Sequence, residues 1–291
     1  MIITSLKNSS KTANLIAKKL KCKYIETEIK TFPDGDIYLR YKSEIKNKKL
    51  IIVESFQPNS NEALYNIVFA GKTAKDLGAK QIILVAPYLA FMRQDKRFNS
   101  GEAINAKIMS ELINNSVDKI ITVDPHLHRI RKMSDIFKIK SKRLTANQAI
   151  GNFIEKNFKN EVIMGPDWES YQWADEIAKI AKTQSTCLEK TRHSYRDVDV
   201  KLVKEIPIKG KNVIIVDDII STGNTMIKAA IKAKKLGAKS VSCVGIHGLF
   251  VENALKKMKK HFNNIFTVNT IEHNTNKIDI TDTLIKEIKK K

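Results

Sequence analysis

Cysteine is scarce in this chain of 291 residues: the three present, Cys22, Cys187 and Cys243, lie far apart and form no Cys-x-x-Cys pair. Scattered cysteines in odd number argue against a disulfide framework and fit a reducing compartment, so we expect a cytoplasmic location. Long hydrophobic runs are also missing, because the longest, Ile82–Met92, is interrupted by Pro87. A bilayer-spanning helix needs about 18 apolar residues, so we expect no membrane partner.

Glycine and proline are sparse too, with 11 Gly and 6 Pro, which excludes collagen-like and low-complexity disordered chains. Hydrophobic residues make up 42% of the chain and charged residues 29%, as in globular proteins. A chain of this length can bury a sizeable core and favours about two domains.

Acidic residues are outnumbered: 52 Lys and Arg against 31 Asp and Glu give a net charge of +21. This charge suggests a polyanionic partner, which could be nucleic acid, a membrane surface or a phosphorylated small molecule. Arginine, the usual reader of base edges, accounts for only 8 of the 52 basic residues, however, and the lysines are spread along the chain. We interpret the charge as a compositional bias and expect no specific nucleic acid partner.

Short runs rich in isoleucine and valine alternate with longer amphipathic stretches. The expected strands are Leu50–Val53, Gln81–Ala86, Lys119–Val123, Glu161–Met164, Val213–Val216 and Ser240–Ile246. The expected helices are Asn61–Leu77, Ile104–Asn114, Asp175–Lys182 and Thr225–Leu236. Continuously apolar strands that alternate with helices predict an α/β fold in which helices cover both faces of a parallel sheet.

The chain also repeats itself. Leu50–Ser55 (LIIVES) resembles Val213–Asp218 (VIIVDD), and Ala74–Tyr88 resembles Ala233–His247, each pair containing a strand in the same place. The second pair shares Leu-Gly-Ala-Lys, where the glycine supplies a left-handed cap to the preceding helix. We therefore expect two similar α/β domains in tandem, at residues 1–142 and 143–279, followed by a basic helix at 280–291.

The stretch Val213–Thr225 (VIIVDDIISTGNT) has the strongest chemical signature. A buried strand leads into Asp217 and Asp218, then into a loop of small residues and a helix. Ligands of open α/β sheets bind at the carboxyl ends of strands, where a loop and a helix N-terminus together surround an anion. Carboxylates beside that anion would accept hydrogen bonds from sugar hydroxyls. The residues expected to hold a sugar phosphate are Asp217, Asp218, Ser221, Thr222, Gly223, Asn224 and Thr225.

This stretch resembles the binding motif for phosphoribosyl pyrophosphate (PRPP) that phosphoribosyltransferases share with the ribose-phosphate pyrophosphokinases. The resemblance implies that both domains have phosphoribosyltransferase-like folds, and that the loop holds the 5-phosphate while Asp217 contacts the ribose. The motif alone does not separate the two kinds of enzyme.

Segments outside the motif resemble the pyrophosphokinase family in particular. FPDGDIYLR (Phe32–Arg40) is similar to a segment that binds ATP, and Pro87–Lys107 is similar to one whose Arg-Gln pair contacts ATP. The resemblance implies ATP contacts by Phe32, Asp34, Gly35, Asp36, Arg93 and Gln94. Taken alone, Phe32 would fit a core aromatic and the Pro-Asp-Gly sequence an ordinary turn.

Three further segments resemble family sites for metal and catalysis. VDPHLHRI (Val123–Ile130) and the archaeal-type MGPDWES (Met164–Ser170) imply that His126 and Asp167 are ligands of Mg²⁺. LEKTRHS (Leu188–Ser194) resembles the catalytic flexible loop, which makes Lys190 and Arg192 the catalytic residues, with Arg192 also contacting ribose 5-phosphate. A magnesium site with so few protein ligands would need substrate phosphates to complete it.

The resemblance implies an enzyme that transfers the β,γ-diphosphoryl group of ATP to ribose 5-phosphate and gives PRPP and AMP for nucleotide biosynthesis. It also implies an N-terminal ATP domain, a C-terminal sugar-phosphate domain and a homo-oligomer. Two alternatives stay open: a phosphoribosyltransferase that uses PRPP, and a non-catalytic, synthetase-like regulatory subunit.

Overall fold

The chain forms two compact α/β units. The computed structural model describes residues 1–127, 130–192 and 198–290, and of residues 189–192 and 198–201 it describes only the backbone. Unit 1 comprises residues 1–144, 270–272 and 281–291, and unit 2 comprises residues 145–269 and 273–280. Among the described residues, no helix has the length and apolar character to cross a membrane.

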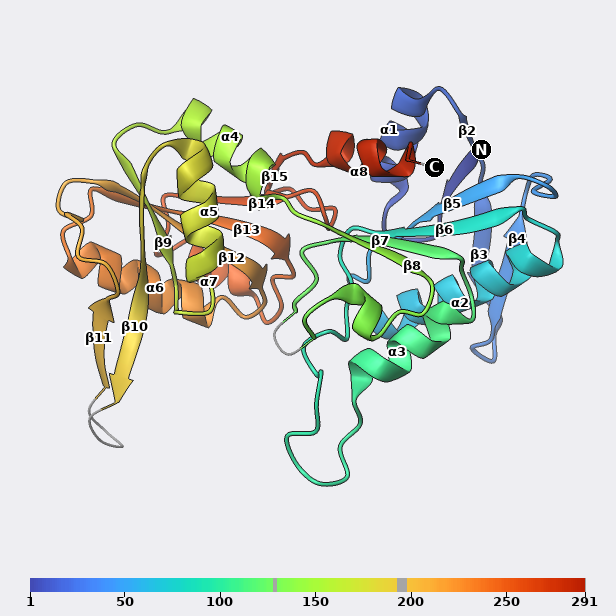
Figure 1. The fold of residues 1–291 in the computed structure, drawn as a ribbon, viewed down its shortest axis with the longest axis horizontal. Coiled ribbons are helices and arrows are strands. Elements are labelled where there is room, and N and C mark those ends of the chain that lie inside the picture. Colours follow the sequence, from blue (N-terminus) through green and yellow to red (C-terminus); the bar gives the residue numbers. More distant parts are fainter. Residues whose placement is uncertain (128–129, 193–197, 291) are drawn as a thin grey trace. The chain divides into compact units, whose positions relative to one another are not determined.

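Unit 1 is built on a parallel sheet of six strands in the order β2-β1-β5-β6-β7-β8. These strands are β1 (Ile2–Ser5), β2 (Lys23–Tyr24), β5 (Lys49–Val53), β6 (Gln81–Ala86), β7 (Lys119–Val123) and β8 (Lys140–Leu144). The helices are α1 (Ser10–Leu20), α2 (Ser60–Asp76), α3 (Asn105–Asn114), α8 (Thr281–Ile288) and the short 3₁₀ helix η1 (Met133–Asp135). Helices α1 and α8 lie on one face of the sheet, and α2 and α3 lie on the other (Figure 1). An antiparallel hairpin, β3 (Thr27–Thr31) and β4 (Ile37–Tyr41), forms a separate small sheet.

Unit 2 has a sheet of seven strands in the order β11-β10-β9-β12-β13-β14-β15. The strands are β9 (Glu161–Gly165), β10 (Gln184–Arg192), β11 (Val198–Leu202), β12 (Asn212–Ile220), β13 (Ser240–Gly248), β14 (Asn264–Val268) and β15 (Asn276–Ile278). All neighbouring pairs are parallel except β10 and β11. The helices are α4 (Asn147–Asn157), α5 (Tyr171–Ala181), α6 (Asn224–Lys235) and α7 (Ala254–Met258). Helices α4 and α5 pack together on one face of this sheet, and α6 and α7 on the other (Figure 1).

The expected α/β fold with two similar parallel-sheet domains is confirmed. The strand order β1-β5-β6-β7-β8 of unit 1 recurs in unit 2 as β9-β12-β13-β14-β15. The central strands are continuously apolar because helices cover both faces of the sheet, and Leu50–Val53 is completely buried. The glycines of the repeated Leu-Gly-Ala-Lys, Gly78 and Gly237, have φ angles of +73° and +84° and follow the ends of α2 and α6, as expected of left-handed caps.

Two expected boundaries differ by four residues: α5 begins at Tyr171 instead of Asp175, and β12 ends beyond Val216. We expected this strand to end at Val216, but it continues through Asp217 and Asp218 to Ile220. It does so because β13 pairs with it along its whole length, up to Ile220 opposite Gly248. The expected helix at the C-terminus is present as α8, which packs against α1 in unit 1.

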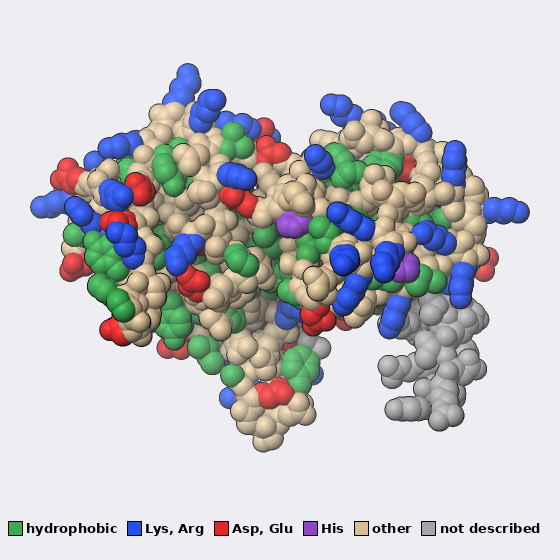
Figure 2. Space-filling view, turned by 180° about the vertical axis from the view of Figure 1, so that it is seen from behind, with side chains coloured by type: hydrophobic (Ala, Val, Ile, Leu, Met, Phe, Trp, Pro, Cys, Tyr) green, Lys and Arg blue, Asp and Glu red, His purple; other side chains and the backbone are tan. Residues whose placement is uncertain are grey.

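Basic side chains are distributed widely over the surface. Figure 2 shows lysine and arginine side chains over the visible faces of both units, with acidic side chains between them. The expected lack of a specific nucleic acid partner stays a prediction.

Candidate active site

The candidate sugar-phosphate site of unit 2 begins at an open edge of β12. Pairing of β12 with β9 ends where Ile215 meets Met164, whereas pairing with β13 continues to Ile220. After Ile215, β12 is therefore hydrogen-bonded in the sheet only to β13. Its other edge extends beyond the end of β9 and has no strand partner there among the described residues. Asp217 lies on this segment and is half-buried, whereas Asp218 is buried.

Three carboxylates influence one another at this edge. Burial raises the pKa of Asp217 well above its usual range, and the negative charges of Asp218 and Asp167 raise it further. The amide N–H of Asp218 donates to Oδ1 of Asp217 at 3.0 Å and acts in the opposite direction, because it stabilises the ionised form. A cation or a set of sugar hydroxyls placed here would relieve the repulsion among these groups.

Asp167 is held in a fixed orientation just beyond β9. Its Oδ1 accepts hydrogen bonds from the amide N–H of Ser170 at 3.1 Å and from the Ser170 hydroxyl at 3.0 Å. Ser170 immediately precedes α5, so these bonds tie Asp167 to the start of that helix. The family resemblance gives Ser170 no role, although a serine three residues after an aspartate is a common turn signal.

The loop after β12 leads directly into helix α6. Gly223 precedes the helix with a φ of +75°, and a Cβ at this position would lie 2.7 Å from Sδ of Met258. Both observations favour glycine at this position. Ser221 and Thr222 are half-buried, while Asn224 and Thr225 are exposed in the first turn of α6, where the amide groups have no partner within the helix. The hydroxyls, the amides and the helix dipole together make a site suited to a phosphate.

The expected ATP segment of unit 1 is the turn of the β3–β4 hairpin. Phe32 donates its amide N–H to the carbonyl of Asp36 at 2.8 Å, and Gly35 donates to the carbonyl of Phe32 at 2.9 Å. Oδ1 of Asp34 accepts from the amide of Asp36 at 3.2 Å. The Phe32 ring is 49% exposed and contacts Tyr38 edge-on, so it is not a core aromatic. The closed turn therefore presents one aromatic face and two carboxylates to solvent.

Arg93 and Gln94 lie in the long segment between β6 and α3. Arg93 is exposed. Gln94 is half-buried, and its Oε1 accepts from Nδ2 of Asn105 at 2.7 Å, while its side chain also bonds Glu102. Gln94 thus stabilises its own segment, and Arg93 is the member of the pair that faces solvent.

His126 follows β7 and is half-buried. Two residues before it, Asp124 is completely buried and has a φ of +36°, which is unusual for a residue other than glycine. Its amide donates to the carbonyl of Leu144 at 2.9 Å, and its Oδ1 lies 3.6 Å from Nη2 of Arg143. Asp124 therefore shapes the turn that carries His126. The sequence gives Asp124 no role, since its backbone strain is visible only in the structure.

Lys190 and Arg192 lie on a β-hairpin arm, where the sequence predicts a loop. The first part of β10 pairs with β9, and from Leu188 onward β10 pairs instead with β11, so that Lys190 is opposite Val200 and Arg192 opposite Val198. The arm extends away from the sheet (Figure 1). The side chains of Lys190 and Arg192, and the whole of residues 193–197, lie outside the described part of the structure.

The expected site residues fall into two groups. Asp167, Asp217, Asp218 and residues 221–225 come together at the carboxyl ends of β9 and β12 in unit 2. Phe32, Arg93, Gln94 and His126 belong to unit 1. Two parallel-sheet units, one of which carries acids and a glycine-led helix N-terminus at the carboxyl ends of its strands, define a protein of the phosphoribosyltransferase fold type.

Comparison with known proteins narrows this class. Residues 1–116 match the N-terminal domain of ribose phosphate pyrophosphokinase, and residues 133–282 match the phosphoribosyl transferase domain. The chain is 34% identical over 262 residues to the ribose-phosphate pyrophosphokinase of Pyrococcus abyssi, with 90% of each chain covered. It is 31% identical over 271 residues to that of Sulfurisphaera tokodaii, with 92% of each covered.

A solved structure agrees in fold. The phosphoribosylpyrophosphate synthetase from Mycobacterium smegmatis superimposes with a TM-score of 0.87 at 22% identity, covering 99% of this chain and 97% of that one. This chain belongs to the ribose-phosphate pyrophosphokinase family.

Proposed function

We propose that this chain is a ribose-phosphate diphosphokinase, which transfers the β,γ-diphosphoryl group of ATP to the C1 hydroxyl of ribose 5-phosphate and gives PRPP and AMP. The observation that carries the proposal is the site of unit 2, where Asp217 lies at the open edge of β12 and Gly223 leads into α6. The carboxylates suit the ribose hydroxyls, and the start of α6 suits the 5-phosphate. Membership of the family supports the same reaction.

ATP is assigned to unit 1. The exposed ring of Phe32 would stack on adenine, and Asp34 and Asp36 would accept hydrogen bonds from the base amino group or the ribose. Arg93 would contact the nucleotide, with Gln94 holding the segment in place. The turn at Gly35 keeps Phe32, Asp34 and Asp36 together at the end of the β3–β4 hairpin, which supports a single binding element.

Magnesium fits the chemistry of the donors. The ionised forms of Asp167 and Asp217 disfavour each other, and a hard cation with oxygen ligands would offset that repulsion. Among the described residues no group of three or more His, Cys, Asp or Glu side chains could hold a metal, so a bound Mg²⁺ would keep waters and take substrate phosphate oxygens. Asp167 in unit 2 and His126 in unit 1 are each proposed as a ligand of Mg²⁺. Once bound, it would neutralise the negative charge of the diphosphate.

The protein's own groups would act by position and charge. The reaction needs in-line attack of the sugar O1 on the β-phosphorus, with negative charge spreading over the transferred oxygens. Asp217 and the start of α6 would orient the sugar, and the ammonium of Lys190 and the guanidinium of Arg192 would stabilise the charge that develops. The hairpin arm offers a way to bring these two cations over the transferred group and to exclude water from it.

The alternatives predict different chemistry. A phosphoribosyltransferase would use the Val213–Thr225 loop but has no need of the ATP segment in unit 1. A regulatory subunit should have lost motif residues, whereas this chain keeps His126, Lys190 and Asp217. Neither alternative is favoured.

The test is direct. The purified chain is incubated with ATP, ribose 5-phosphate and Mg²⁺, and AMP and PRPP are quantified. Equal amounts of the two products support the proposal, and the Asp217→Asn variant serves as the control for contaminating activity. Consumption of PRPP with a free base would indicate a phosphoribosyltransferase, and the absence of any product would indicate a regulatory subunit.

Location and assembly complete the proposal. The three cysteines are free and scattered, which supports a reducing cytoplasm. The family resemblance supports a homo-oligomer, and light scattering of the purified chain would give the number of subunits.

A further inference from the structure

Unit 1 contains a structural counterpart of the Asp217 site. The segments LIIVES and VIIVDD align residue for residue, so Glu54 corresponds to Asp217. Glu54 comes directly after β5, and Asp217 comes directly after the part of β12 that aligns with β5. The neighbouring strands match as well: Ile2 pairs with Leu50 in unit 1, and Val162 pairs with Val213 in unit 2. Ile2 therefore corresponds to Val162, and the residues five positions later, Lys7 and Asp167, correspond to each other.

The counterpart in unit 1 is closed by a carboxylate of the chain itself. Glu54 is completely buried, and its two oxygens accept hydrogen bonds from three successive backbone amides. Leu6 N–H donates to Oε2 at 3.2 Å, and Lys7 N–H donates to Oε1 at 3.0 Å. Asn8 N–H donates to Oε1 at 3.0 Å and to Oε2 at 3.2 Å. Three amides that converge on one carboxylate form a nest of the kind that binds anions.

Other contacts hold this loop in place. Ser9 Oγ accepts from the amide of Ser55 at 2.9 Å, and Asn8 Nδ2 donates to the Ser55 carbonyl at 3.1 Å. The Ser55 hydroxyl donates to the carbonyl of Thr270. The loop between β1 and α1 is therefore fixed on several sides, and the carboxyl group of Glu54 accepts the hydrogen bonds at its centre.

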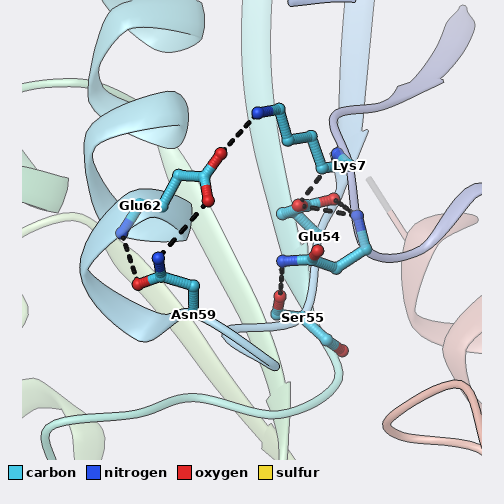
Figure 3. Close-up of polar contacts among 6 residues, drawn as sticks. Lys7, Glu54, Ser55, Asn59 and Glu62 are labelled. Atoms are coloured by element: carbon cyan, nitrogen blue, oxygen red, sulfur yellow. Dashed lines mark hydrogen bonds and ion pairs between the residues drawn. The ribbon is translucent and has the colours of Figure 1, made fainter. Parts of the chain in front are cut away.

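The charges around Glu54 are arranged differently from those in unit 2. The ammonium of Lys7 points away from Glu54 and pairs with Glu62 on α2 (Figure 3). Glu272 accepts from the amides of Lys11 and Thr12 at the start of α1, and its charge also raises the pKa of Glu54. Where unit 2 places Asp217 against Asp218 and Asp167, unit 1 places the carboxyl group of Glu54 against three amide donors, with Glu272 as a further nearby acid.

We propose that the amides of Leu6, Lys7 and Asn8 form an anion-binding nest whose permanent ligand is the Glu54 carboxylate, and that removal of this carboxylate opens the nest to a small oxyanion. Acetate and inorganic phosphate share the chemistry that the nest recognises, which is an oxygen anion able to accept several N–H bonds. The inference concerns unit 1 alone and holds whatever reaction unit 2 supports. It explains why one of two similar units has a closed strand end.

The experiment follows amide hydrogen exchange of the peptide that contains residues 2–16, by mass spectrometry of the full chain. In Glu54→Ala, exchange of the Leu6–Asn8 amides should accelerate by about 10-fold or more, as expected when several hydrogen bonds to one buried carboxyl group are lost. Acetate should restore slow exchange with saturation, while chloride at equal ionic strength should not. Inorganic phosphate in a second arm should also protect if the nest admits a tetrahedral anion, and acetate protection alone would restrict it to carboxylates.

Two further variants keep the test sharp. Glu54→Gln retains the length of the side chain but offers one acceptor oxygen and places an N–H₂ group against the amides, so it should exchange fast and show no response to acetate. Glu62→Gln removes a neighbouring surface carboxylate and should leave the Leu6–Asn8 amides as slow as in the wild type. If Glu54→Ala does not fold, Glu54→Gln still decides: wild-type exchange in that variant would overturn the proposal. So would fast exchange in Glu54→Ala that acetate and chloride affect equally.

Discussion

Ser170 fixes Asp167: both the amide and the hydroxyl of Ser170 donate to Oδ1 of Asp167, at 3.1 and 3.0 Å. Near Asp217, the Asp167 carboxylate therefore has its Oδ1 hydrogen-bonded to Ser170, and its Oδ2 is available to a ligand. One oxygen of Asp167 thus positions the carboxyl group, and the other can bind a ligand.

Ser170→Ala should weaken the use of Mg²⁺ several-fold without changing the dissociation constant of ATP. The change removes every hydrogen bond of the Ser170 hydroxyl, which donates to Oδ1 or the carbonyl of Asp167 and accepts from the Asp167 amide at 3.2 Å. It leaves the hydrogen bond from the Ser170 amide to Oδ1, so the loss in the positioning of Asp167 should be about 1 kcal/mol. Titration of activity with Mg²⁺ measures the effect. Ser240→Ala is the control, because Ser240 bonds Asn212 at the opposite end of the sheet. An unchanged magnesium requirement would show that Asp167 does not depend on Ser170.

Asp217→Asn should weaken the use of ribose 5-phosphate much more than the binding of ATP. A carboxylate accepts two hydroxyls, whereas an amide presents one acceptor and one donor, so the loss should be about 1.5–3 kcal/mol, or roughly 10- to 150-fold. Steady-state kinetics in each substrate measures it. Asp175→Asn, which alters an acid on α5 that pairs with Lys179, should leave both constants unchanged. Wild-type kinetics for the sugar phosphate in Asp217→Asn would remove this residue from the site.

Gly223→Ala should lower the melting temperature more than Gly35→Ala does. Both glycines have a positive φ, at +75° and +99°, so alanine strains the backbone by roughly 1–2 kcal/mol at either position. At Gly223 the new Cβ would also meet Met258 at 2.7 Å, whereas nothing lies within 4 Å at Gly35. Thermal unfolding of the two variants compares the costs, and equal melting temperatures would mean that Met258 moves aside freely.

Lys190→Ala should lower turnover by about 10²–10³ while leaving ATP affinity nearly unchanged, because the ammonium meets charge that develops only in the transition state. The measurements are a single-turnover rate and an ATP dissociation constant. Lys182→Ala, at an exposed lysine paired with Glu155, is the matched control. A rate within about twofold of the wild type would place Lys190 outside the mechanism.

Stability should fall as the pH rises from about 5 to 8, through the titration of Glu54. Burial raises the pKa of this carboxyl to about 7, and the three amide donors act in the opposite direction. Because the native state holds the proton at a pH where the unfolded chain has lost it, the group's contribution is largest at low pH and is lost as the pH rises through 7. The change amounts to roughly 3 kcal/mol at most. Denaturant titrations of wild type and Glu54→Gln across this range test it, and parallel pH profiles would contradict it.

The sequence alone determined the class of fold and the candidate sugar-phosphate residues, because both depend on local patterns, while the other candidate residues came from the family resemblance. Apolar runs, the Leu-Gly-Ala-Lys caps and the Val213–Thr225 motif are properties of neighbouring residues, and β6 and β7 have the bounds that the pattern predicts. The repeat also predicted two similar sheets, since a repeated order of elements buries its apolar strands in the same way twice.

Tertiary structure decided how these elements meet. The extension of β12 to Ile220 depends on its partner β13, and the hairpin arm that carries Lys190 depends on β11. The same holds for Glu54 and Asp217, which occupy matching positions in the repeat: one is enclosed by amides of the β1–α1 loop and the other faces Asp167. Such differences arise from long-range contacts that no local pattern records, because the cost of a buried charge is set by whichever groups the fold brings beside it.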